Sequence, residues 1–133
     1  MQRGFTIVEL MITVVVIAIL TSVGYVTYTE QMARARRTAA RSLVLEVMQH
    51  EERFYTENNT YTADLAAMGY GAELYTDRNS HRISLAAGPT GAIATSVAVT
   101  ATAVIADDKC TTLTLTSGNA ESGTGSQPAV CWR

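Results

Sequence analysis

Glu9 is the residue whose type and position most clearly call for a chemical role. It lies near the start of a nearly continuous apolar segment, Phe5 to Val26, and no charged residue follows it from Leu10 to Thr29. A charged side chain in the middle of a bilayer costs roughly 3 kcal/mol on insertion scales. A carboxylate in such a place usually has a partner or a function, so we expect Glu9 to have one.

Catalytic chemistry has little support elsewhere in the chain. His50 and His81 are isolated, and no serine, threonine or aspartate stands in a pattern typical of an activated nucleophile. The pair Asp107 and Asp108 could touch a cation, but two adjacent carboxylates are more often a solvated turn. We therefore predict that the protein is not an enzyme and has neither a cofactor nor a metal site.

The apolar segment itself is long enough to cross a membrane. Its 22 residues would form a helix about 33 Å long, close to the thickness of a bilayer core. A cleaved secretory signal peptide is the alternative, with a small-x-small site at Ser22-Val23-Gly24. Glu9 argues against it, because a carboxylate weakens a signal peptide and has no use in a discarded one. The chain of 133 residues fits one domain, and its net charge of −2 gives no bulk bias toward nucleic acid.

Residues 30–57 are expected to continue as a helix, because they contain no proline or glycine and are rich in strong helix formers. Apolar residues in this part recur on one face, which a downstream sheet would cover: Leu43, Val44, Val47, Met48, Phe54 and Tyr55. Glu51 falls within this stripe, either at an exposed edge, which we favour, or opposite a basic group of the sheet. Four arginines, Arg34, Arg36, Arg37 and Arg41, form a basic cluster that could meet lipid headgroups, solvent, or acidic residues of a neighbouring molecule such as Glu46, Glu51 or Glu52.

Strand-like segments follow a loop that contains Asn58-Asn59-Thr60. Alternating patterns indicate strands at 73–76, 81–87, 92–106 and 109–116, separated by turn residues. Leu113 and Leu115 share an inner face, whereas Cys110 has the opposite parity. The prediction is an α+β fold, in which one long N-terminal helix packs against three or four antiparallel strands.

The segment "RGFTIVELMITVVVIAIL" resembles the N-terminus of type IV pilins. The resemblance implies that a prepilin peptidase cuts between Gly4 and Phe5 and that the new N-terminal residue, Phe5, is methylated. Glu9 would be the fifth mature residue, and in a filament it could pair with the Phe5 amine of a neighbouring subunit, since a buried carboxylate needs a counter-charge. Ala18 and Val26 stand where related pilins often have glycine and proline, so local unwinding of the helix on assembly is in doubt.

The downstream segments "LVLEVMQHEERFYTENNTYTADL" and "CTTLTLTSGNAESGTG" resemble PilE-type minor pilins and the related ComP-type receptors for DNA uptake. The resemblance implies a "lollipop" pilin: a leader (1–4), a membrane or filament-core half of the helix (5–29), an amphipathic half (30–57) and a periplasmic sheet domain (58–133). In an oxidising periplasm, Cys110 and Cys131 would form a disulfide that closes a glycine-rich loop. A metal or redox pair is the alternative, but the CxxC spacing and nearby histidines are missing.

We therefore expect a minor pilin of a type IV pilus that supports pilus assembly, twitching motility or adhesion. Its partners would be other pilins, the prepilin peptidase and inner-membrane lipid, with the chain in the inner membrane before assembly and in the pilus afterwards. The alternative is a pilus-borne DNA receptor, with a type II secretion pseudopilin less favoured. DNA contact would fall to the basic residues beyond the helix, Arg78, Arg82, Lys109 and Arg133, which face enough acidic neighbours that we expect weak binding.

Overall fold

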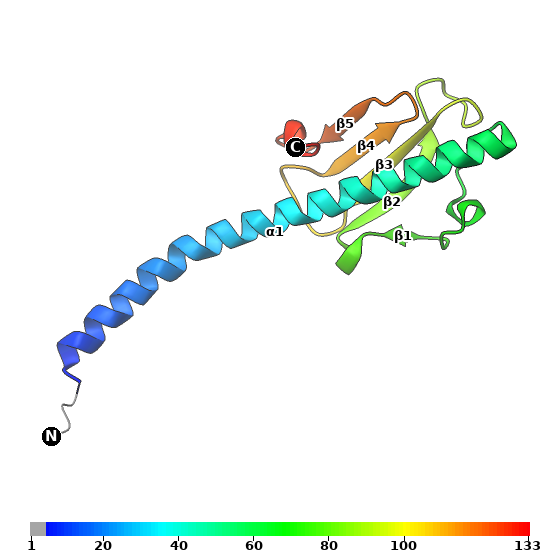
Figure 1. The fold of residues 1–133 in the computed structure, drawn as a ribbon. Helices are drawn as coiled ribbons and strands as arrows, with labels where there is room; N and C mark the ends of the chain where they lie inside the picture. Colours follow the sequence, from blue (N-terminus) through cyan, green and yellow to red (C-terminus); the bar gives the residue numbers. More distant parts are fainter. Residues whose placement is uncertain (1–4) are drawn as a thin grey trace. The chain divides into compact units, whose positions relative to one another are not determined.

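The computed structural model describes residues 5–133, apart from the side chains of Val23 and Val26 and the surroundings of Gly24. The chain divides into two compact units, one ending at Arg34 and the other comprising Ala35–Arg133, which we call the head. Helix α1, Ile7–Asn58, contributes residues to both units (Figure 1). The predicted helix over 30–57 is confirmed. At its end Asn59 adopts a left-handed conformation, with φ of 58°, and its N–H donates to the carbonyl of Tyr55 over 2.7 Å.

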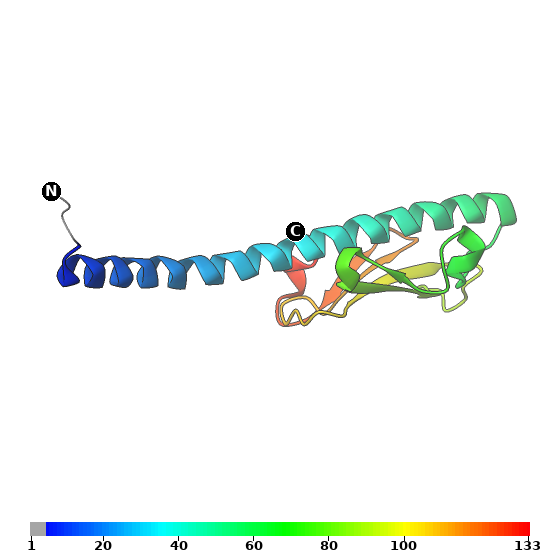
Figure 2. The ribbon, with the colours of Figure 1, turned by 90° about the horizontal axis from the view of Figure 1, so that it is seen from below.

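The head part of α1 buries one stripe of side chains, as the helical periodicity predicts. Ala40, Val44 and Val47 are fully buried, Met48 is nearly so, and Tyr55 packs against them at the edge of the core. Figure 2 shows this part of the helix lying along one face of the sheet. The helix therefore supplies one of the two layers that enclose the core of the head.

The second layer is a five-stranded antiparallel sheet, one or two strands larger than predicted. Its strands follow the chain order without crossovers: β1 (Leu74–Tyr75), β2 (His81–Ala87), β3 (Val97–Ala103), β4 (Thr112–Thr116) and β5 (Glu121–Thr124). The bounds of β2 match the prediction, whereas β3 and β4 are shorter than predicted. Residues 92–96 and 104–106, which were predicted to belong to β3, form turns on either side of the strand. Ile105 therefore lies in the β3–β4 connection.

The two faces of the sheet differ as the alternation predicts. Buried side chains toward the helix come from three central strands: Ile83, Val97, Val99, Ala101, Leu113 and Leu115. On the opposite face, Ser84 pairs with Thr100, and Thr100 pairs with Thr114. The two threonine hydroxyls are 2.9 Å apart, so they satisfy each other on the solvent side.

Strand β5 is the element that the sequence did not predict, because its segment is rich in glycine. Gly123 pairs with Leu113, and a Cβ at this position would lie 2.7 Å from Sγ of Cys131. The glycine is therefore what allows the strand to approach the disulfide between Cys110 and Cys131, whose Cα atoms are 5.4 Å apart. Both cysteines are fully buried in the core. The parity argument for Cys110 was wrong, because β4 begins only at Thr112 and the alternation cannot be extended back to Cys110.

Short 3-10 helices complete the head. Leu65–Met68 lies in the loop after α1, and Asp64 caps it by accepting the N–H of Ala66 over 2.9 Å. Asp77–Asn79 joins β1 to β2, and Pro128–Val130 precedes Cys131. Leu65 is buried against the core, so the loop after α1 closes one side of the head.

Candidate functional site

The first candidate site lies at the start of α1. Thr6 precedes the helix and its Oγ1 accepts the N–H of Glu9 over 3.3 Å, which caps the first turn. Glu9 in that turn is favoured by the helix dipole. Its side chain is exposed, and among the residues that the structure describes its carboxylate has no partner. The carboxylate is thus available for a group from outside this chain.

Phe5 lies four residues before Glu9 in sequence and is 80% exposed. Gly4, the residue predicted to precede the cleavage site, lies outside the described residues. Phe5 and Glu9 are therefore both presented at the beginning of the helix without contacts that would occupy them within the described chain.

Helix α1 is long and apolar enough to cross a membrane by length and composition, near the N-terminus of the chain. Three hydroxyl groups of the apolar part hydrogen-bond within the helix: Thr13 donates to the carbonyl of Leu10 over 2.8 Å, Ser22 donates to that of Ile19 over 2.8 Å, and Thr21 donates to that of Ile17. Such back-bonding removes the cost of placing a hydroxyl among lipid tails or neighbouring helices. Glu9 is the charged side chain of this span, and a partner must supply the opposite charge.

The second candidate site is the end of the sheet that holds the basic residues predicted for DNA contact. Arg78 lies in the β1–β2 connection and Arg82 lies early in β2, while Lys109 lies in the β3–β4 connection. Because consecutive strands are antiparallel, these two connections and the chain after β5, with Arg133, share one end of the sheet. The four residues therefore lie at one end but are distributed across the width of the five strands.

Acidic neighbours limit the charge that this end presents. Arg82 pairs with Glu73, with 3.2 Å between its Nη2 and Oε1 of the glutamate, and both side chains are more than half exposed. Asp77 and Asp108 are exposed beside Arg78 and Lys109 in sequence. Arg78 itself is exposed and has a left-handed backbone, with φ of 59°. The arrangement supplies separate cations rather than one continuous basic surface.

A buried ion pair at the same end was missed by the sequence analysis. Arg37 of α1 donates from Nε and Nη2 to the carboxylate of Asp107, over 2.6 and 2.8 Å, and the two side chains are only 4% and 10% exposed. Asp107 also accepts the N–H groups of Lys109 and Cys110. The interpretation of Asp107 as a solvated turn residue was wrong. The basic cluster was expected to face lipid, solvent or a neighbouring molecule, and for Arg37 this was wrong too. The spacing could have indicated that Arg37 is buried, because Arg37 lies three residues before Ala40, which belongs to the buried stripe.

Burial and the ion pair with Arg37 shift the pKa of Asp107 in opposite directions. Burial alone would raise its pKa, but the hydrogen bonds and charge of Arg37 outweigh it, so the pKa of this carboxyl lies below its ordinary value. Asp107 therefore stays ionised and holds the β3–β4 connection against α1.

Glu51 contradicts both interpretations offered for it. It is fully buried rather than exposed, and its Oε2 accepts the backbone N–H of Thr62 over 3.2 Å instead of a basic side chain. Its Oε1 is buried without a hydrogen-bond partner among the described residues. Burial, with a smaller contribution from the charge of Glu52, raises the pKa of Glu51 above its ordinary value.

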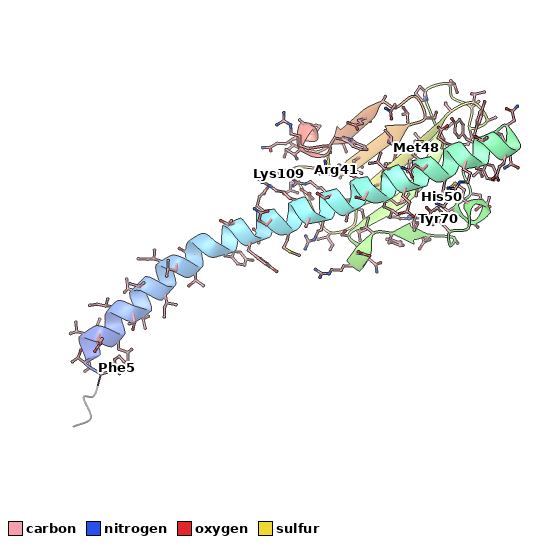
Figure 3. All side chains as sticks on the ribbon, in the orientation of Figure 1. Phe5, Arg41, Met48, His50, Tyr70 and Lys109 are labelled. Atoms are coloured by element: carbon pink, nitrogen blue, oxygen red, sulfur yellow. A yellow bond between two sulfur atoms is a disulfide. The ribbon has the colours of Figure 1, made fainter. Side chains whose placement is uncertain are left out.

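The other acidic residues of this helix face also have partners within the head. Tyr61 donates to Glu52 over 2.9 Å, and Tyr70 donates to Glu46 over 3.1 Å. In Figure 3, Tyr70 lies next to His50, and their ring centroids are 5.2 Å apart. Burial first, and then the hydrogen bond to Glu46, raise the pKa of Tyr70 to about 12.

His81 is the buried titratable group of the second site. Its Nδ1 lies 3.3 Å from Oγ of Ser80, and its Nε2 is buried without a partner among the described residues. Burial lowers the pKa of His81 below its ordinary value, although the charge of Asp107 acts in the opposite direction. His81 and Ser80 form a packed polar cluster with Thr76, whose Oγ1 lies 2.7 Å from Oγ of Ser80.

Comparisons with known proteins address both candidate sites. The family described as type IV minor pilin ComP, DNA uptake sequence receptor, matches residues 27–114. The prokaryotic N-terminal methylation motif matches residues 1–25, which include Phe5 and Glu9. The two matches together cover α1 and the head as far as β4.

Individual relatives are pilins of other bacteria. The chain is 30% identical over 87 residues to the type IV major pilin protein PilA of Myxococcus xanthus, and 30% identical over 92 residues to the fimbrial protein EcpC of Eikenella corrodens. It is 32% identical over 66 residues to PilA4, the type IV wide pilus major component of Thermus thermophilus. These alignments cover 65%, 69% and 50% of this chain, but only 39%, 60% and 50% of the respective relatives.

Proposed function

The chain is a type IV pilin that belongs to the family of the minor pilin ComP, and on that premise we propose that it serves as a minor subunit of a type IV pilus. The observation that carries the proposal is the exposed, unpartnered carboxylate of Glu9 on an otherwise apolar helix in the described chain. A group of this kind is costly in lipid and useful only when another molecule supplies the opposite charge.

Cleavage after Gly4 would create that opposite charge. The new N-terminus, the amine of Phe5, is positive, and in a helical filament it would lie among apolar helices of neighbouring subunits. Glu9 of one subunit would then pair with the amine of the next. Because a register without this pairing leaves a buried charge uncompensated, the pair would set the axial position of each subunit.

The test is to compare filament incorporation of Glu9→Val and Glu9→Gln with that of Leu10→Val, a neighbouring change that leaves the charge. All three variants should enter the membrane, the two Glu9 variants at least as well as the unaltered chain, because a costly charge is gone. Sheared filaments should contain Leu10→Val at the unaltered level and much less of the Glu9 variants. Equal amounts of all variants in filaments would contradict the charge-pair account.

A second function, that of a DNA-uptake receptor in the pilus, is favoured by one observation. The family match includes the DNA uptake sequence receptor in its description and covers most of the head. Arg78, Lys109 and Arg133 lie at one end of the sheet, where they could contact phosphates. The pairing of Arg82 with Glu73 and the exposed aspartates lead us to expect weak binding at physiological salt.

Gel shift with double-stranded DNA decides between the two functions. The fragment from Thr29 onward is suitable, since the buried core lies within Ala35–Arg133. The comparison is between the unaltered fragment, Arg78→Ala, Lys109→Ala and the control Arg53→Ala, an exposed arginine near the other end of α1 in the head. Submicromolar binding that falls steeply with salt, weakens in the first two variants and persists in the control would establish the receptor function. Weak binding that no variant changes would support the structural function alone.

A further inference from the structure

The β3–β4 connection carries an exposed apolar pair, Val104 and Ile105. Their side chains are 57% and 37% exposed, and Leu45 is the other large hydrophobic residue of the head's described surface that is comparably exposed. The backbone of the pair is held in place, because the N–H groups of both residues donate to the carbonyl of Ser80, over 2.9 and 3.3 Å. The connection therefore presents two apolar side chains from a fixed backbone rather than from a loose loop.

The ion pair between Arg37 and Asp107 fixes this connection to α1. Arg37 follows Thr29, the last residue of the uncharged stretch, by only eight residues. Eight residues span at most about 27 Å even when fully extended, and about 12 Å as a helix. The connection that Arg37 holds is therefore within reach of the bilayer surface while the span is inserted.

Basic residues lie on both segments that the Arg37–Asp107 pair joins. Arg36 and Arg41 lie on the same part of α1 as Arg37, and Lys109 lies two residues after Asp107 in the connection. The negative charge of Asp107 is compensated by Arg37, which leaves Asp108 as the acidic residue of the connection. A surface that combines exposed apolar side chains with arginine and lysine has the composition that binds the interface of anionic membranes.

We propose that Val104 and Ile105 insert into the interface of an anionic bilayer before assembly, while Arg36, Arg41 and Lys109 contact lipid phosphates. The inference rests on the proposed function only in requiring that the span be in a membrane. It gives the basic cluster after the span a role on the side of the membrane where the head lies. The contact would hold the head against the lipid surface until the subunit is extracted into a filament.

The experiment measures the depth of the connection in vesicles that contain the full chain. In a Trp132→Phe background, a tryptophan is introduced by Val104→Trp or, as the matched control, by Ala120→Trp, an exposed position in the β4–β5 connection at the opposite end of the sheet. Vesicles of phosphatidylcholine, with and without phosphatidylglycerol, contain lipids brominated on the acyl chains. These lipids quench a tryptophan that lies within the interface.

We expect quenching of Val104→Trp to be at least about threefold that of Ala120→Trp with phosphatidylglycerol present, since interfacial groups lie ~5–10 Å into the headgroup and acyl boundary. Quenching should decrease without the anionic lipid. The variant Val104→Ser/Ile105→Ser should abolish protection of the connection from added protease in the same vesicles, while near-ultraviolet circular dichroism shows an unchanged fold.

Resistance of the chain to extraction by alkaline carbonate separates the two ways of failing. Carbonate-resistant chain with equal quenching at both positions would overturn the inference and leave the proposed function intact. The inference would also be overturned if quenching were equal and Val104→Ser/Ile105→Ser reduced filament yield, which would assign the connection to contact between subunits. Chain that carbonate extracts would contradict the membrane anchoring in the proposed function, and the inference with it.

Discussion

Arg37 and Asp107, seventy residues apart in sequence, are joined by two hydrogen bonds in a nearly dry environment. The pair links the start of the head part of α1 to the connection that leads into the disulfide, because Asp107 also accepts the N–H of Cys110. A charge pair of this kind contributes little net stability compared with apolar residues of the same size, but its partners become costly when separated.

Removing one partner of this pair should therefore destabilise the head strongly. Arg37→Met leaves the Asp107 carboxylate buried without its counter-charge, and we expect a loss of about 3–5 kcal/mol in the free energy of unfolding. Urea denaturation of the head measures it, with the exposed Arg53→Met as the control. The double variant Arg37→Met/Asp107→Asn should regain much of the loss, because the amide is uncharged and its oxygen can still accept the N–H groups of Lys109 and Cys110. A double variant as unstable as the single one would show that shape, not charge, determines the effect.

Glu51 should make the stability of the head decrease with rising pH. Its folded pKa is raised above the ordinary 4.5 by burial, so the folded state binds the proton more tightly than the unfolded chain. The contribution of Glu51 to the stability of the head is fully present below pH 4.5 and is lost as the pH rises through the folded pKa. In Glu51→Gln this part of the pH dependence should vanish, whereas the exposed Glu57→Gln should retain it. Identical profiles for Glu51→Gln and the unaltered head would refute the assignment.

His81 should affect the stability of the head with the opposite sign, at pH values below 6.5. Its folded pKa is depressed by burial, so the unfolded chain binds the proton more readily. The contribution is fully present above the ordinary pKa of 6.5 and is lost as the pH falls from there through the folded pKa. Unfolding free energies measured over this range should lose that slope in His81→Gln and keep it in His50→Gln. A slope that survives in His81→Gln would assign the titration to another group.

Strand β5 should tolerate no side chain at Gly123. Alanine there would place its Cβ within 3 Å of both Sγ and Cβ of Cys131, so the strand or the disulfide must shift. We expect Gly123→Ala to cost about 1–3 kcal/mol, as overpacking of a core does, and Gly118→Ala, in the open β4–β5 connection, to cost less. Thermal unfolding with the disulfide intact is the measurement. Equal stabilities of the two variants would mean that β5 does not pack on the disulfide as described.

The elements that a periodic pattern specifies were predicted closely. The stripe around Val44 and Val47 and the alternation of His81–Ala87 follow from the spacings of 3.6 and 2 residues that a helix and a strand impose on a buried face. Strand β5 has no such pattern, because its packing depends on the absence of a side chain at Gly123 rather than on an apolar one. Local sequence around Glu121–Thr124 contains no signal for that contact.

The buried polar groups escaped prediction for a related reason. Arg37 and Glu51 both lie on the buried stripe by spacing, but hydropathy treats a charged residue as an exposed edge unless its partner is known. The partners, Asp107 and the backbone of Thr62, become neighbours only through the fold. Phe5 and Glu9 belong instead to a contiguous sequence motif, so their roles could be proposed without any tertiary structure, and those roles stay predictions.

The N-terminus of the chain in assembled filaments tests the central claim most directly. Filaments sheared from cells that express the unaltered chain or Gly4→Val, each with a tag at the C-terminus, would be analysed by intact mass and N-terminal peptide mass spectrometry. The account predicts a mature chain that begins at Phe5 with a methylated amine, and absence of Gly4→Val from the filaments. Filaments that contain the chain with residues 1–4 still attached, or with an N-terminus other than Phe5, would contradict it.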